Sequence, residues 1–162
     1  MTAVIVLVTP GPAVTAATPP EMLSLVRPLD DPAVPWLGLL TGVPLLKFSS
    51  DTGAKAVRTI ADDPTFQKRD RGKGARDIAI IGAGVSGMAA ALEARQRGLD
   101  FIILEAAQPF NTIVNFPKGK PIYTYPTDML PEGDLSVTAD VKEGLLEELE
   151  QLVARRVLAV HG

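Results

Sequence analysis

Residues 77–106 read DIAIIGAGVSGMAAALEARQRGLDFIILEA, and this stretch decides the fold. The apolar run at 77–81 is rich in β-branched residues and predicts a short buried strand. Three glycines with the spacing GxGxxG follow, and then a run of strong helix formers, MAAALEARQR. Gly98 stands where a helix C-terminal glycine is expected, and a second apolar run at 101–104 ends at Glu105. The stretch therefore predicts a complete β-α-β unit with parallel strands.

The glycines of this unit have distinct physical functions. Gly82 allows a tight turn out of the strand, Gly84 lets a pyrophosphate approach the backbone, and Gly87 lets the helix pack closely on the sheet. The free amides and the dipole at the helix start favour bound phosphate. The predicted cofactor-binding residues are Gly82, Gly84, Val85, Ser86, Gly87 and Glu105.

Glu105 favours one class of dinucleotide over another. It follows the second strand, 18 residues after Gly87, where a carboxylate can accept hydrogen bonds from ribose hydroxyls. The same charge would repel a 2′-phosphate, so we expect FAD or NAD at this site and not NADP. The glycines do not separate FAD from NAD. A Gly-rich turn without a ligand is the alternative, which the order strand, glycines, helix and acid disfavours.

A family resemblance bears on the choice between FAD and NAD. The stretch quoted above resembles the N-terminal FAD motif of the two-dinucleotide-binding flavoproteins, the thioredoxin-reductase-like and flavin-monooxygenase-like group. NTIVNFP at 111–117, IYT at 122–124 and EGD at 132–134 look like a loop of the bacillithiol-disulfide-reductase-like branch. The resemblance covers about residues 76–153, half of the chain.

The resemblance implies an FAD site at Gly82, Gly84, Gly87 and Glu105, with residues 111–117 near the flavin. It also implies a second Rossmann domain for NADPH and a late Gly-Asp motif, and this sequence contains neither a second GxGxxG nor that motif. We therefore expect an α/β chain that carries an incomplete FAD/NAD(P)-binding domain, missing a C-terminal domain or a partner chain.

The remaining chain divides by composition. Residues 1–46 hold eight of the 14 prolines and predict an irregular apolar arm with a possible short strand at 4–8. Residues 47–76 carry eight basic and four acidic residues and are interpreted as a basic linker region. Its end, KRDRGKGAR at 68–76, is typical of a solvated linker, and a nucleic-acid or targeting patch is the alternative. Residues 77–162 form the partial Rossmann domain. Within it, a long loop spans 106–135, a helix is expected from about Val141 to Arg155, and a third strand is possible at 157–160.

Composition excludes several classes of function. Among 162 residues there is no cysteine and one histidine, so disulfides, iron–sulfur ligation and a His-based metal cluster are not expected. The net charge is −3, which does not favour nucleic acid. The longest apolar stretch, 34–46, is too short and too rich in proline to cross a membrane. We expect a cytoplasmic protein.

Three functional hypotheses remain. The first is the FAD-binding N-terminal portion of an NAD(P)H-dependent flavoprotein oxidoreductase, with no catalytic residue identified. The second is a truncated or partner-dependent nucleotide-binding module without enzyme activity. The third is a fragment of an NAD-dependent Rossmann dehydrogenase. Lys118, Lys120, Tyr123 and Tyr125 of the loop are weaker candidates for ligand contact, and surface exposure or ordinary packing is the simpler interpretation of them.

Overall fold

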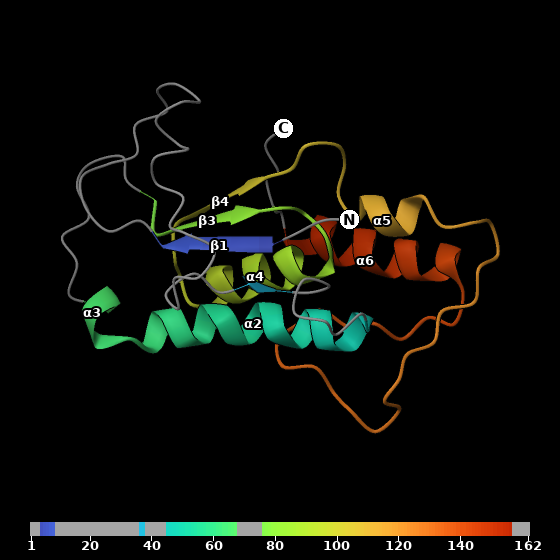
Figure 1. The fold of residues 1–162 in the computed structure, drawn as a ribbon, viewed down its shortest axis with the longest axis horizontal. Helices are drawn as coiled ribbons and strands as arrows, with labels where there is room; N and C mark the ends of the chain where they lie inside the picture. Colours follow the sequence, from blue (N-terminus) through green and yellow to red (C-terminus); the bar gives the residue numbers. More distant parts are fainter. Residues whose placement is uncertain (1–3, 9–35, 38–44, 68–75, 157–162) are drawn as a thin grey trace.

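The computed structural model describes residues 4–8, 36–37, 45–67 and 76–156 (Figure 1). A small sheet, the helix α4 (Val85–Gln96) and the helix α2 (Leu46–Asp62) form successive layers, because α4 packs on the sheet and α2 packs on α4. The helix α6 (Lys142–Arg156) adds its apolar stripe to the same core. None of the helices in these described ranges is long and apolar enough to cross a bilayer.

The sheet has four strands in the order β2-β1-β3-β4. The strands β3 (Ile78–Ile81) and β4 (Phe101–Leu104) are parallel, with Ile78 opposite Phe101 and Ile81 opposite Leu104. With α4 between them in sequence, they confirm the predicted β-α-β unit. The strand β1 (Val4–Val8) confirms the strand expected at 4–8, and it lies antiparallel to β3. The short β2 (Trp36–Leu37) pairs with β1, so the N-terminal region contributes to the sheet.

Helix α4 is buried on more faces than its sequence predicts. Val85, Met88, Ala89 and Leu92 recur at i, i+3, i+4 and i+7, a spacing that predicts one apolar helix face, and all four are buried. However, every residue from Val85 to Ala94 is buried, including the alanines outside that face. The sheet covers one side of the helix and α2 covers another. Gly98 follows the helix with φ of 69°, the left-handed conformation expected of a C-terminal glycine.

The linker expected at residues 47–76 is largely helical, which corrects that interpretation. Helix α2 has 17 residues, and α3 (Pro64–Gln67) follows it at once. Residues 68–75, which hold four of the eight basic residues of this stretch, lie outside the described residues. Helix α2 has no side-chain cap at Leu45, and ten of its 17 residues, Gly53 among them, are weaker helix formers, so its own sequence supports it weakly. Its stability comes from packing against α4 and from ion pairs with distant residues.

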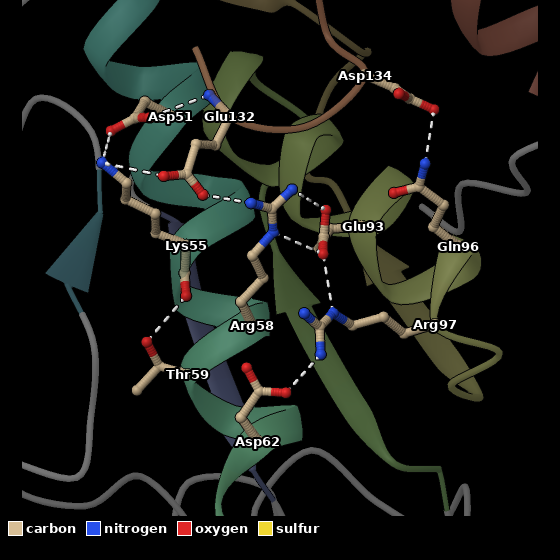
Figure 2. Close-up of polar contacts among 10 residues, drawn as sticks. All are labelled: Asp51, Lys55, Arg58, Thr59, Asp62, Glu93, Gln96, Arg97, Glu132 and Asp134. Carbon is tan, nitrogen blue, oxygen red and sulfur yellow. Dashed lines mark hydrogen bonds and ion pairs between the residues drawn. The ribbon is translucent and has the colours of Figure 1, made fainter.

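The ion pair that joins the two helices is formed by a buried carboxylate and two arginines. Glu93 of α4 is 3% exposed, and it accepts hydrogen bonds from Arg58 of α2 and Arg97 of α4 (Figure 2). Arg97 also pairs with Asp62, at the end of α2. Burial acts to raise the pKa of Glu93, but the hydrogen bonds from the two arginines outweigh it and hold that pKa below the usual Glu range. Glu93 therefore stays ionised and joins α2 to α4.

The C-terminal part of the described chain agrees with the predicted loop and helix. The loop after β4 contains one short helix, α5 (Asn111–Val114), and α6 begins within one residue of the expected position. Leu145 and Leu149 of its apolar stripe are fully buried. Val141, where the helix was expected to begin, instead precedes it, forms an isolated bridge with Pro121 and is 42% exposed. The strand predicted at 157–160 lies outside the described residues.

Because Glu93 is ion-paired in the folded protein, we expect the free energy of unfolding to depend on pH. Because its pKa is lowered by folding, its contribution is present above the unfolded value of ~4.3 and is lost as the pH falls through the lower folded value. We expect Glu93→Gln to reduce the free energy of unfolding at pH 7 by about 2–3 kcal/mol. The variant should also lose less stability than the parent protein on acidification. Urea denaturation between pH 7 and pH 3 measures both effects.

Glu150→Gln on α6 is the matched control, because Glu150 is exposed. It should change stability by less than about 0.5 kcal/mol. Equal effects of the two substitutions would contradict a structural role for Glu93.

Candidate dinucleotide site

The turn between β3 and α4 has a backbone that only glycine accommodates at two positions. Gly82 has φ of 98°, a conformation that other residues rarely adopt. A Cβ added at Gly87 would lie 2.0 Å from the carbonyl oxygen of Gly82 and 3.4 Å from Ile80 Cγ2. The first turn of α4 is therefore in direct contact with the backbone of the turn that precedes it. The sequence-based functions of these two glycines are reproduced in the geometry.

Three hydrogen bonds fix this turn to the loop that follows the neighbouring strand. The amide of Gly82 donates to the carbonyl of Leu104 over 2.7 Å, which continues the parallel ladder. The amide of Ala83 donates to Glu105 Oε2, also over 2.7 Å. The amide of Phe110 donates to the carbonyl of Ala83 over 2.9 Å. The turn is thus held in place by groups on both sides of the carboxyl end of β4.

The N-terminus of α4 presents amides that the helix itself does not use. Gly84 is the N-cap residue and is extended, with φ of −77° and no capping side chain. The first backbone bond of the helix runs from Met88 N to Gly84 O, so the preceding amides have no partner within the helix. Ser86 is 4% exposed, and its Oγ is the one buried side-chain polar atom in the described part of the chain without a hydrogen-bond partner. These groups favour an anion.

Glu105 lies beside the same turn, as the sequence predicts. Its Oε2 accepts from Ala83 N and its Oε1 accepts from Ala107 N, over 3.1 Å. Each carboxylate oxygen has more than one acceptor direction, so a ribose diol can still donate to this side chain. The carboxylate has two functions in this geometry: it orients the Gly82–Gly84 turn and places a negative charge at the end of β4.

Phe110 is a residue of the site that sequence reasoning missed. It has φ of 55°, the left-handed region that a bulky residue rarely occupies, and its side chain is 3% exposed. This conformation directs its amide to Ala83 and begins α5 next to the glycine turn. Pro109 restricts the backbone of Gln108 and not that of Phe110, so no local pattern indicated this conformation.

The loop predicted to lie near the flavin is fixed by the start of α6. Lys142 Nζ donates to the carbonyls of Val114 and Phe116, and the amide of Gly119 donates to Glu143 Oε1. The hydrogen bond from Gly119 is the main cause that lowers the pKa of Glu143 below the usual Glu value. The loop therefore has a defined conformation next to α5.

The weaker loop candidates lie at the surface. Lys118 and Lys120 are exposed, and Lys120 Nζ lies 3.9 Å from the centre of the Phe116 ring. Tyr123 and Tyr125 are 71% and 58% exposed, and their rings stack on each other with centres 6.3 Å apart. None of these contacts joins the glycine turn, and His161 lies outside the described residues.

Comparison with known proteins agrees with this location. The sequence model of the FAD binding domain family matches residues 77–120, which contain the glycine turn, α4, β4 and α5. This family match and the similarity to one curated relative together support an FAD-binding region of a flavoprotein oxidoreductase.

The relative is a ferredoxin–NADP reductase from Lactococcus lactis subsp. lactis (strain IL1403), to which the chain is 39% identical over 85 residues. The match covers 51% of this chain and 24% of the reductase, so the chain spans about a quarter of that relative's length. No solved structure matches the chain. The thioredoxin-reductase-like branch named from the sequence therefore stays a prediction.

The close contact at Gly87 predicts a sharp difference between two helical glycines. In Gly87→Ala the new methyl group would overlap the Gly82 carbonyl, so we expect a loss of about 1–3 kcal/mol of unfolding free energy. In Gly144→Ala on α6 the nearest atom is Ala139 Cβ at 3.4 Å, and alanine should stabilise the helix by about 0.5–1 kcal/mol. Thermal or urea denaturation of both variants measures the difference. Two changes of the same sign would contradict the packing described for the turn.

Proposed function

We propose that this chain binds the ADP part of FAD at the glycine turn, as the FAD-binding portion of an NAD(P)H-dependent flavoprotein oxidoreductase. The observation that carries the proposal is the position of Glu105. Its carboxylate contacts the amide of Ala83 within the turn, so ribose and pyrophosphate recognition are adjacent. The match of the FAD binding domain family to residues 77–120 supports FAD over other anionic ligands.

The residues present fit the proposed cofactor. The amides at the start of α4, with Gly84 lacking a side chain, would bind the pyrophosphate, and the orphaned hydroxyl of Ser86 is available as a further donor. Val85 contributes its amide, while Gly82 and Gly87 give the turn its shape. Glu105 would accept from the adenosine ribose. When bound, the flavin supplies the hydride and electron transfer chemistry, and the protein supplies binding and orientation.

For the reaction of the whole protein, the support is the similarity to the ferredoxin–NADP reductase of Lactococcus lactis. That relative is named a ferredoxin–NADP reductase, and this chain matches 24% of it. We infer that NADPH is the reductant and that a second dinucleotide-binding unit, on a further domain or a partner chain, would bind it. A cytoplasmic location stays a prediction.

Binding of NAD at the same turn is the second candidate, because the glycines and Glu105 suit the ADP part of NAD equally well. The family match at residues 77–120 favours FAD. A nucleotide-binding module without activity would have the same site geometry, and the difference lies in whether a bound flavin can be reduced.

FAD binding by the full chain is the direct test. After incubation with FAD and gel filtration, the protein should retain a flavin absorption band near 450 nm, and ADP should compete with FAD. Gly84→Val should weaken FAD binding at least about 100-fold, because a branched side chain would occupy the approach to the pyrophosphate. Gly144→Ala on α6 is the control and should bind as the parent does. A folded parent protein without bound flavin would overturn the proposal, and NAD titration would then test the second candidate.

Glu105 predicts the choice between nucleotides with and without a 2′-phosphate. In competition with FAD, we expect ADP to bind at least about tenfold more tightly than 2′-phospho-ADP. Glu105→Gln should weaken ADP binding and narrow this ratio, because the negative charge that repels the 2′-phosphate is removed. An unchanged ratio in the variant would show that Glu105 does not face the ribose.

A further inference from the structure

Helix α2 lies parallel to α4, with the two N-termini at the same end of the molecule (Figure 1). Successive contacts between the two helices involve residues of increasing number in both, as expected for parallel helices. Gly53 lies against the backbone of Ser86. Further along both helices, Arg58 binds Glu93 and Asp62 binds Arg97 (Figure 2). The first of these contacts falls within the predicted cofactor-binding residues. Residues 46–62 lie before the stretch matched by the FAD binding domain family, so neither that match nor the sequence motif includes them.

The contact at Gly53 is as close as the one at Gly87. A Cβ added at Gly53 would lie 2.1 Å from the carbonyl oxygen of Ser86 and 3.1 Å from Ala89 Cβ. Ser86 belongs to the first turn of α4 and precedes Gly87, whose own missing Cβ makes room for the Gly82 carbonyl. Two glycines thus bring two separate backbones against one helical turn. The position of that turn depends on both contacts, because a carbonyl oxygen of the backbone cannot rotate away as a side chain can.

A flank of α2 is fastened by the segment 126–135, which also reaches α4, because Gln96 Nε2 donates to Asp134 Oδ2 over 3.3 Å (Figure 2). Ser50 Oγ donates to the carbonyl of Leu135 over 2.8 Å, and the amide of Glu132 donates to Asp51 Oδ1 over 3.0 Å. Lys47 Nζ donates to the carbonyls of Pro126 and Met129, each over 2.9 Å. Glu132 adds ion pairs to Lys55 and Arg58 (Figure 2). The segment therefore holds α2 against α4 in addition to the direct contacts between the two helices.

We propose that Gly53 is a positioning residue for the dinucleotide site, which extends the functional unit to a helix outside the glycine motif. The inference rests on the proposed function. Amides bind a pyrophosphate well only when they are already oriented toward it, and displacements of about 1 Å have large effects on such sites. Gly53 sets the distance between α2 and the first turn of α4, and so fixes the amides of Val85, Ser86 and Gly87.

The experiment compares Gly53→Ala with Arg97→Ala in the full chain. Both variants loosen the contact between α2 and α4, but Arg97 acts at the end remote from the glycine turn. For Gly53→Ala we expect a Kd for FAD and for ADP at least about tenfold higher than in the parent protein. For Arg97→Ala we expect a Kd within about twofold. Alanine is a better helix former than glycine, so a loss in Gly53→Ala reflects the contact and not helix propensity.

Hydrogen exchange without ligand gives a readout that does not depend on FAD. In Gly53→Ala the amides of residues 85–90 should exchange at least about tenfold faster than in the parent protein, and in Arg97→Ala they should change less. If the parent protein binds no FAD, the proposed function fails, while these exchange rates still test whether Gly53 positions the turn. Exchange and Kd values in Gly53→Ala equal to those of the parent would overturn the inference. The inference would also be overturned if, in both Gly53→Ala and Arg97→Ala, the loss of affinity for FAD were proportional to the loss of unfolding free energy.

The parent protein supplies the test if Gly53→Ala does not fold. The amides of residues 50–58 and 85–92 should then exchange as one cooperative unit, with similar protection. Exchange of α2 at least about 100-fold faster than a still protected α4 would overturn the inference, because a helix that opens independently cannot fix the turn beneath it.

Discussion

The backbone contact between the first turn of α4 and the turn that precedes it is the constraint on which the site depends. The carbonyl oxygen of Gly82 occupies the space that a side chain at residue 87 would need. Because no side chain intervenes, the helix N-terminus comes directly to the carboxyl ends of β3 and β4. Amides without helical partners, a positive helix end and the carboxylate of Glu105 then meet in one place. This arrangement suits a dinucleotide with a free ribose and a pyrophosphate.

Much of the β-α-β unit was predictable because its signals are local. The apolar runs, the glycine spacing and Gly98 each determine a conformation within a few residues, and the structure reproduces them. Helix α2 was not predictable in this way. Its apolar face consists of small residues such as Gly53 and Ala54, and its charged residues resemble those of a solvated segment. Their partners, Glu93 and Glu132, are 35 and 74 positions from Arg58, so no local pattern shows them.

The pairing of β1 was equally hidden from the sequence. The run at 4–8 predicts a strand, but neither its neighbour nor its direction is encoded in a short apolar pattern. In the structure β1 pairs antiparallel with β3, on the side opposite β4. The candidate site residues could be named from the sequence because a dinucleotide motif has a fixed spacing. Phe110 and Gly53 were missed because each acts on the glycine turn from elsewhere in the chain, through one backbone contact.

Hydrogen–deuterium exchange of the full chain with and without FAD tests the central claim most directly, since it shows where the cofactor binds. With FAD present, we expect slower exchange at the amides of residues 83–88 and 105–107, with little change in α6. ADP should reproduce this protection, because the proposed contacts are with pyrophosphate and ribose. Protection confined to other segments, or no protection in a protein that retains flavin, would contradict the assignment of the glycine turn as the FAD site.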